Sequence, residues 1–259
     1  MDSLLSLAPN IDLLKQVYTC IDNTSLEGSD NCERIQQLCQ KSIILQDPDK
    51  GVNHVAAVCV YPTFVHFAKS LLFNSGIRVA SVAGAFPAGQ SPIEIKLQEV
   101  NYAVAQGADE IDMVISRGAF LEGNYDLVAN EIAAFRRATQ GLTLKVILET
   151  GELLSPANIA KASYIAMESG ADFIKTSTGK IPISATPDAV QTMVNTAHDF
   201  YLRTGKMVGV KVAGGVSTPE QALQYAQIFI QQFGKELLTY QHFRVGASRL
   251  TDKLFAFLT

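Results

Sequence analysis

Short apolar segments rich in β-branched residues recur about every 20 to 40 residues along the chain. Most are hydrophobic almost continuously rather than at alternate positions, a pattern typical of parallel strands covered on both faces. The eight segments that we predict to be strands are Val17–Ile21, Val55–Tyr61, Arg78–Ala83, Glu110–Ile115, Leu144–Glu149, Asp172–Thr176, Val208–Val212 and His242–Gly246.

The segments between these strands carry patterns typical of helix starts. In four of them a serine or threonine precedes a proline, as in an N-cap followed by the first helical position. The pairs are Ser91-Pro92, Ser155-Pro156, Thr186-Pro187 and Thr218-Pro219, and the helices predicted after them are Ile93–Gln106, Ala157–Ser169, Asp188–Tyr201 and Glu220–Phe233. Met1–Lys15 is predicted to form an additional helix packed outside the main fold.

Repeated alternation of strand and helix predicts an α/β fold with parallel strands joined by right-handed crossovers. Eight such units favour a closed (β/α)8 TIM barrel with an extra N-terminal helix. An open doubly wound sheet is the alternative, but no G-x-G-x-x-G loop follows the first predicted strand. No linker rich in Gly, Pro or Ser divides the chain, so we expect residues 1–259 to form one domain.

Composition narrows the range of partners. A net charge of −4 and the lack of a basic cluster give no electrostatic basis for binding nucleic acid. No apolar stretch approaches the ~18 residues that span a bilayer, so we expect no membrane partner. The four cysteines lack C-x-x-C spacing and are interpreted as reduced thiols of a cytoplasmic protein. The four histidines show no ligand spacing, so we expect no metal site.

Two lysines stand at the ends of predicted core strands. Lys175 lies in the run FIKTSTGK, residues 173–180, and Lys211 lies in VGVKVAGG, residues 208–215. Removing a charge from water at such a position is costly. A poorly solvated ammonium loses its proton more easily and then acts as a nucleophile, and a second ammonium nearby favours that loss. We therefore predict covalent amine chemistry on a carbonyl compound, with Lys175 as the nucleophile.

Asp112 lies inside an apolar strand, and a buried carboxylate needs a cationic partner. Lys175 and Lys211 are the natural candidates. Because a carboxylate beside Lys175 would keep that amine protonated, we expect Asp112 nearer to Lys211, which it would hold charged while the pair relays protons. A structural ion pair that fills the barrel is the alternative interpretation.

Three loops of small residues follow the last three predicted strands. They are Thr176–Lys180, Ala213–Val216 and Gly246–Ser248, and each offers backbone N–H groups to an anion. Since loops after the seventh and eighth strands of a barrel commonly bind phosphate, the three together predict a phosphate cup. We expect Lys145 to join the internal charge network, and Glu149 either to support the site or to cap the next helix.

These runs, together with KVILETGE at residues 145–152 and GADEID at residues 107–112, resemble the deoxyribose-phosphate aldolases from about Asp22 to Leu250. The resemblance implies a cytoplasmic (β/α)8 class I aldolase that needs no metal or organic cofactor. Such an enzyme cleaves a small phosphosugar, 2-deoxy-D-ribose 5-phosphate, reversibly into D-glyceraldehyde 3-phosphate and acetaldehyde through a lysine Schiff base, in deoxyribonucleoside catabolism. The family forms dimers or tetramers, and a homodimer is expected here.

The resemblance also implies residue roles. Lys175 becomes the Schiff-base lysine, Lys211 the second catalytic lysine and Asp112 the proton relay. The substrate-binding positions fall on Asp22, Thr24, Cys59, Thr178, Gly179, Lys180, Gly214, Gly215, Gly246 and Ser248. The chain departs from many relatives at Val212, where they have proline, and from some at Arg249, where they have a second serine.

Two other function classes remain open. One is a metal-dependent or PLP-dependent barrel enzyme, whose metal version is opposed by the missing histidine cluster. The other is a catalytically silent barrel that binds a phosphosugar without forming product.

Overall fold

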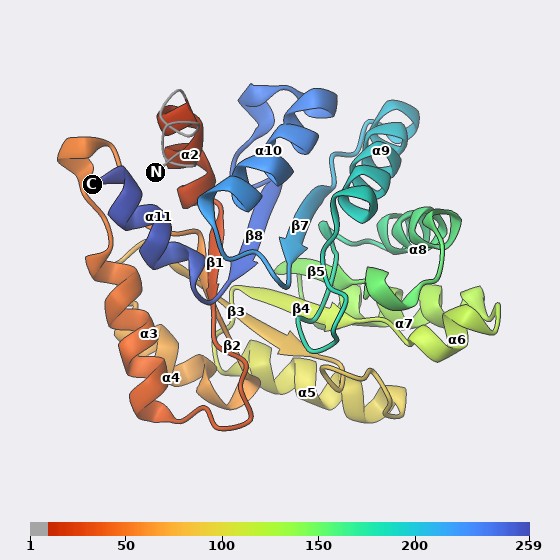
Figure 1. The fold of residues 1–259 in the computed structure, drawn as a ribbon. Coiled ribbons are helices and arrows are strands. Elements are labelled where there is room, and N and C mark those ends of the chain that lie inside the picture. The colour runs from red at the N-terminus through yellow and green to blue at the C-terminus, as the bar shows by residue number, and fades with distance from the viewer. Residues whose placement is uncertain (1–9) are drawn as a thin grey trace.

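The computed structural model describes residues 10–259, which contain a closed barrel of eight parallel strands in sequential order (Figure 1). The strands are β1 (Ile21–Thr24), β2 (Ala57–Val60), β3 (Arg78–Ala83), β4 (Glu110–Val114), β5 (Thr143–Ile147), β6 (Phe173–Lys175), β7 (Gly209–Ala213) and β8 (Phe243–Ala247). Strand β8 pairs with β1 and closes the ring. The (β/α)8 barrel predicted from the sequence is confirmed.

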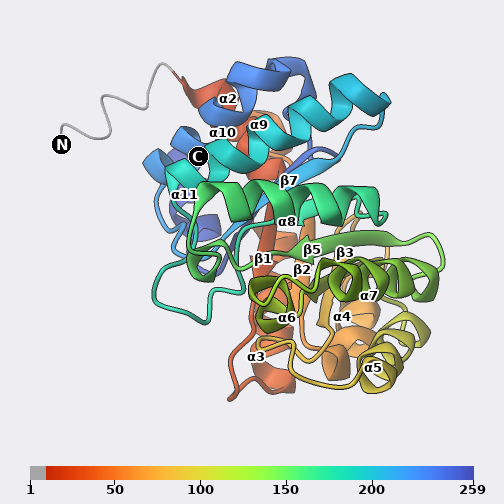
Figure 2. The ribbon, with the colours of Figure 1, turned by 90° about the vertical axis from the view of Figure 1, so that its right-hand side faces the viewer.

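Helices surround the barrel, as the two views at right angles show (Figures 1 and 2). They are α2 (Ile11–Thr19), α3 (Cys32–Ile44), α4 (Val65–Leu71), α5 (Ile93–Ala105), α6 (Arg117–Leu121), α7 (Tyr125–Ala138), α8 (Pro156–Glu168), α9 (Pro187–Thr204), α10 (Pro219–Phe233) and α11 (Leu250–Leu258). Short 3-10 helices are η2 (Pro48–Lys50), η3 (Pro62–Phe64), η4 (Thr150–Glu152) and η5 (Lys235–Leu237). No helix among the described residues combines the length and the hydrophobicity needed to cross a bilayer.

The extra N-terminal helix is α2, which packs against α10 and α11. It ends later than the predicted Met1–Lys15, and residues 1–9 of that prediction lie outside the described residues. Consequently the first predicted strand, Val17–Ile21, is wrong: most of it is the end of α2. Leu14, Val17 and Tyr18 are buried at helical spacing, and a short apolar run cannot by itself distinguish a buried helix from a strand.

The other seven predicted strands overlap the observed ones, with ends shifted by at most two residues. Three of the four predicted caps are also confirmed: Ser155, Thr186 and Thr218 each accept a hydrogen bond from the backbone N–H three residues later. Ser91 is not a cap, because Pro92 occupies that position without a side-chain hydrogen bond. The three caps fix the starts of α8, α9 and α10, which follow the loops at the carboxyl ends of β5, β6 and β7.

The inner face of the barrel is divided into an apolar wall and a charged wall. The apolar wall is a separate buried cluster of small side chains from β2 and β3 with one loop residue: Leu26, Ala57, Cys59, Ala80 and Val82. Long charged side chains occupy the rest: Asp22, Glu110, Asp112, Lys145, Lys175, Lys211 and Arg244, each at most 3% exposed. Most barrels fill these layers with branched apolar residues, so the charged wall requires a specific explanation.

We expect Gly209→Ala to lower the free energy of unfolding by about 1–3 kcal/mol in urea titrations, because the barrel has no room for the added methyl group. Gly209 pairs with Phe173, and a Cβ at this position would meet a carbon of the Phe173 ring at 2.3 Å.

The matched control is Gly28→Ala, since a Cβ there has no neighbour within 4 Å. It should change stability by no more than about 0.5 kcal/mol. Equal stabilities of the two variants would show that the barrel interior adapts to the extra volume.

Candidate active site

A cavity of about 270 Å³ opens at the carboxyl ends of β6, β7, β8 and β1, with Lys175 in its wall. Eight of the predicted substrate-binding residues line it: Thr24, Thr178, Gly179, Lys180, Gly214, Gly215, Gly246 and Ser248. Asp22 and Cys59 do not line the cavity, because both are fully buried inside the barrel. The sequence therefore located most of the cavity wall, and the roles predicted for Asp22 and Cys59 stay predictions.

The structure brings together all three predicted catalytic residues. Lys175 and Lys211 are paired positions of β6 and β7, so their side chains leave the sheet at the same level. Nζ of Lys175 donates to Oδ2 of Asp112 at 2.8 Å, and Nζ of Lys211 donates to the same oxygen at 2.7 Å. Asp112 is thus shared equally, and the expectation that it lies nearer to Lys211 is wrong.

The two lysines nevertheless differ in basicity. Burial lowers the pKa of Lys175 below its ordinary value; Asp112 opposes this effect, and the neighbouring ammonium of Lys211 adds to it. Burial also lowers the pKa of Lys211, but Asp112 and Asp22 together outweigh burial and leave that pKa above its ordinary value. The site therefore holds an amine that is less basic than an ordinary lysine, as a nucleophile requires, beside an ammonium that stays charged.

Asp112 also binds a third lysine. Nζ of Lys145 donates to Oδ1 of Asp112 at 2.7 Å, so Lys145 joins the internal network as expected. Burial alone would raise the pKa of Asp112, but the attraction of Lys145, Lys175 and Lys211 holds it well below the usual range. Asp112 is an anion whose two oxygens are both occupied, and this fixes the positions of the lysines around it.

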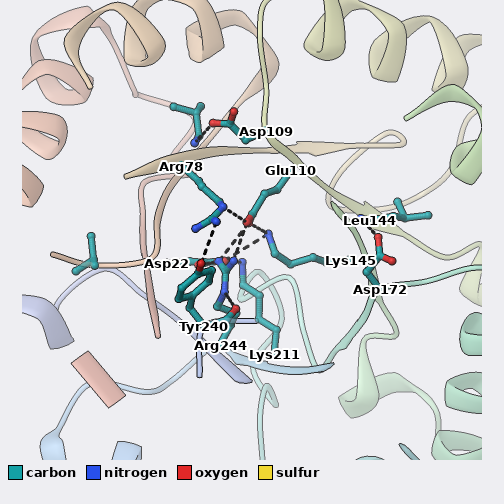
Figure 3. A network of polar contacts seen from close by, with 12 residues as sticks. Asp22, Arg78, Asp109, Glu110, Leu144, Lys145, Asp172, Lys211, Tyr240 and Arg244 are labelled. Carbon is teal, nitrogen blue, oxygen red and sulfur yellow. Dashed lines mark hydrogen bonds and ion pairs between the residues drawn. The ribbon is translucent and has the colours of Figure 1, made fainter. Parts of the chain in front are cut away.

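Two further charged residues of the network, Arg244 and Glu110, were missed from the sequence, and Figure 3 shows them with Asp22, Lys145 and Lys211. Arg244 donates to Oδ1 of Asp22 at 2.5 Å and to Oε1 of Glu110 at 2.7 Å. Glu110 pairs with Lys145 at 2.6 Å, and Asp22 accepts from Lys211 at 2.5 Å. A clue was present: Glu110 precedes Asp112 by two residues and Arg244 precedes Gly246 by two, which places each pair on one face of its strand.

Glu149 organises the loop after β6. Its carboxylate accepts from the backbone N–H of Thr178 at 3.2 Å and from the Thr178 hydroxyl at 2.5 Å. The same carboxylate binds Arg117, which sequence reasoning missed, at 3.0 Å. Glu149 therefore supports the site and makes no side-chain cap. Because the hydroxyl of Thr178 also accepts from the N–H of Lys180 at 3.1 Å, the N–H groups of Thr178 and Lys180 are engaged within the loop and are not offered to an anion.

The loops after β6 and β7 are joined to each other. The hydroxyl of Thr176 donates to the carbonyl of Ala213 and accepts from its N–H, both at 2.9 Å. Gly214 and Gly215 follow with φ of 85° and 81°, a region that disfavours side chains. A Cβ on Gly214 would also meet Ser184 at 2.4 Å. These contacts fix a glycine turn at the cavity edge, with backbone groups that a ligand can approach closely.

Cationic side chains lie at the same end of the cavity. Lys180 and Arg249 belong to its wall, and Lys180 forms an ion pair of 3.0 Å with Glu27 across the mouth. Together with the glycine loops after β7 and β8 they make this end suitable for an anion. Cys59 adds no charge to the site, since burial raises the pKa of its thiol. Among residues 10–259, no group of three or more His, Cys, Asp or Glu side chains is arranged to hold a metal ion.

Comparisons with known proteins agree with this geometry. Residues 10–238 match the model of the family described as DeoC/LacD family aldolase. The mouse protein named deoxyribose-phosphate aldolase is 44% identical over 253 residues, which cover 93% of this chain and 79% of the mouse protein. The solved structure of the aldolase QR15 is 31% identical with a TM-score of 0.77 and covers 93% of this chain and 96% of its own. The Aeropyrum pernix deoxyribose phosphate aldolase, described as a tetramer, shares the fold at 24% identity and a TM-score of 0.75, covering 98% of this chain and 95% of its own.

We expect Asp112→Asn to lower the free energy of unfolding at pH 7 by about 3 kcal/mol or more, because removing one partner leaves buried cations uncompensated. The depressed pKa of Asp112 adds stability that is fully present above the unfolded value near 3.9 and is lost as the pH falls toward the folded value. Urea titrations at pH 7 and pH 3 should therefore show that wild type and Asp112→Asn differ less in their free energy of unfolding at pH 3 than at pH 7.

Asp252→Asn is the control, since Asp252 pairs with Lys41 on the surface and is 47% exposed. It should cost no more than about 1 kcal/mol at pH 7. A deficit in Asp112→Asn that is small at pH 7, or that grows in acid, would show that the shared carboxylate does not stabilise the fold.

Proposed function

The chain belongs to the DeoC/LacD family of aldolases, and from this premise we propose that it cleaves 2-deoxy-D-ribose 5-phosphate reversibly into D-glyceraldehyde 3-phosphate and acetaldehyde. The chemistry proceeds through a Schiff base on Lys175. One observation carries the proposal: Lys175 lies in the cavity wall, and its amine has a lowered pKa and donates to a carboxylate shared with the Lys211 ammonium. The name of the mouse relative supports the choice of substrate.

In the first step, neutral Nζ of Lys175 attacks C1 of the open-chain aldehyde. The carbinolamine that forms loses water and becomes an iminium ion. Lys211 supplies the proton that leaves with the water, and Asp112, whose Oδ2 accepts from both Lys211 and Lys175, relays it. The new positive charge replaces the ammonium that Lys175 would otherwise carry, so the buried carboxylate stabilises the iminium ion by the same contact.

In the second step, the iminium ion accepts electrons. A base takes the proton of the C3 hydroxyl, the C2–C3 bond breaks, and its electron pair moves to form an enamine between C2, C1 and Nζ. The former C3 becomes the aldehyde of glyceraldehyde 3-phosphate. Protonation of the enamine at C2 regenerates an iminium ion, and water then releases acetaldehyde and the free amine of Lys175.

The phosphate binds at the other end of the cavity. The backbone of Gly214, Gly215 and Ser248 and the cations Lys180 and Arg249 form the proposed cup. The amine and the cup lie in one cavity wall, so binding the phosphate places the aldehyde carbon at Lys175. The free energy of binding the phosphate is thereby used to orient the aldehyde end of the substrate.

We further propose that residues 1–259 act as one barrel domain in the cytoplasm, as a homodimer. All four cysteines are free, as expected in a reducing compartment. Light scattering on the purified protein measures the number of subunits. A mass equal to one chain or to four chains would contradict the homodimer.

We expect acetaldehyde and borohydride to attach an ethyl group to Lys175, located by peptide mass mapping. Lys175→Met should lose this adduct and lower kcat about 10³-fold or more, since no covalent intermediate can form. Lys211→Met should keep the adduct on Lys175 but lower kcat by roughly 10²–10⁴-fold, because a proton donor is lost.

The exposed Lys206→Met serves as the control and should behave as wild type. An adduct on Lys211 in place of Lys175 would reverse the two roles. A wild-type protein that binds the phosphosugar but forms neither adduct nor product would be a silent binding barrel.

We expect Lys180→Met to raise KM for 2-deoxyribose 5-phosphate roughly tenfold or more, because a charge-assisted contact with phosphate is lost. KM for unphosphorylated 2-deoxyribose should stay unchanged, since that substrate has no anion for Lys180 to bind. Steady-state kinetics on both sugars, with Lys206→Met again as control, make the comparison. Equal changes for the two sugars would place the phosphate elsewhere.

A further inference from the structure

The charged wall of the barrel forms one connected, buried cluster. Its members are Asp22 of β1, Glu110 and Asp112 of β4, Lys145 of β5, Lys175 of β6, Lys211 of β7 and Arg244 of β8, all at most 3% exposed. Ion pairs no longer than 3.5 Å link all seven side chains. A cluster this deep has little water to screen it, so its charges must balance from within.

Three carboxylates face four basic groups in this cluster. If every basic group carried a proton, the cluster would hold one uncompensated positive charge. It is neutral when one of the four is deprotonated. Arg244 cannot be that group, because a guanidinium keeps its charge in proteins. The missing proton must therefore come from one of the three lysines.

The contacts decide which lysine. Lys145 contacts three carboxylates of the cluster, and Lys211 contacts two. Among the described residues, Lys175 forms an ion pair with Asp112 alone. Lys175 is thus the least stabilised ammonium of the three lysines. We therefore expect Lys175 to be the lysine whose loss of a proton makes the cluster neutral.

We propose that Arg244 and Glu110, which do not line the cavity, are positioning residues that set the protonation state of Lys175 in opposite directions by fixing the charge balance of the cluster. The inference rests on the proposed Schiff-base chemistry of Lys175. Arg244 bridges Asp22 and Glu110, and through them it reaches Lys211 and Lys145 (Figure 3). From Lys211 and Lys145, both routes reach the amine of Lys175 through Asp112, which contacts all three lysines.

Other groups face the cluster but contribute less to its charge balance. Cys59 on β2 is a neutral thiol, because burial raises its pKa. Arg78 on β3 lies 3.7 Å from Glu110, but its side chain is 36% exposed and water screens its charge. The hydroxyl of Tyr240 accepts a hydrogen bond from Arg78, and the backbone carbonyl of Tyr240 accepts one from Arg244.

The two positioning residues carry opposite charges, so their removal should have opposite effects. Arg244→Met leaves the cluster with an excess negative charge when Lys175 is neutral, which favours protonation of Lys175. Glu110→Gln leaves an excess positive charge, which disfavours it. Since Lys175 must be neutral to attack, the acid limb of the pH profile should move to higher pH in Arg244→Met and to lower pH in Glu110→Gln.

The test measures kcat/KM against pH, because this ratio reports the groups of the free enzyme. Each single variant should move the acid limb by about half a pH unit or more, roughly threefold in rate at a fixed pH on that limb. The double variant Glu110→Gln with Arg244→Met removes one charge of each sign, and its acid limb should return toward the wild-type position. A purely structural role would lower stability in all three variants without this pattern of signs.

A second buried ion pair provides the matched control. Lys96 and Glu131 lie 3.0 Å apart between α5 and α7, with side chains 1% and 8% exposed. Lys96→Met and Glu131→Gln should lower stability as the cluster variants do, but leave the acid limb where it is. If Arg244→Met does not fold, Arg78→Gln removes a partly exposed cation beside Glu110 and should move the limb in the same direction by a smaller amount.

Trapping with acetaldehyde and borohydride tests the proposed function separately from the proposed role of Arg244 and Glu110. If the wild type forms no adduct at Lys175, the proposed function fails. If the wild type forms the adduct, but the limbs of Glu110→Gln and of the arginine variant stay in place or move together, only the role of Arg244 and Glu110 is overturned. Opposite shifts with an unmoved control support it.

Discussion

The structure depends on one constraint: the interior of an eight-stranded barrel has to be filled, and charges that fill it have to cancel. Small side chains on β2 and β3 leave space on one side, and long basic side chains from β5 to β8 occupy that space. Three carboxylates anchor these chains through short contacts. Stability and reactivity thus arise from the same side chains, because the arrangement that satisfies the buried charges also leaves one amine short of partners.

Loops at the carboxyl end convert this interior into a site. The Thr176 hydroxyl holds the end of β6 against β7, and Glu149 fixes the next turn through Thr178. Glu149 itself has a left-handed backbone, with φ of 57°, which turns its carboxylate into the loop after β6. The cavity wall is therefore set by backbone and buried side-chain contacts, and Lys175 enters it from a strand rather than from a mobile segment.

The sequence predicted the fold and the centre of the site because both depend on strong local patterns. Apolar strands that alternate with capped helices indicated the barrel. Lys175, Lys211 and Asp112 indicated the site because they are charged residues within apolar strands. Strand β1 was misplaced because its inward residues are polar and the helix before it is apolar. Arg244 and Glu110 were missed because their importance comes from contacts across the barrel, between strands far apart in the sequence. The same limit applies to Thr178, whose N–H group is taken by Glu149.

The ion pair between Glu27 and Lys180 joins two residues of the cavity wall. It connects the loop after β1 with the loop after β6 when no anion is bound. In the proposed phosphate cup, a phosphate that binds Lys180 would compete with Glu27 for this amine, and the ion pair would form again when the phosphate leaves. Because Glu27 is largely exposed, this exchange costs little in either direction, and added salt weakens both contacts together. In the proposed phosphate cup, Lys180 would therefore exchange one carboxylate partner for the phosphate, so that tight binding of the substrate need not trap the product.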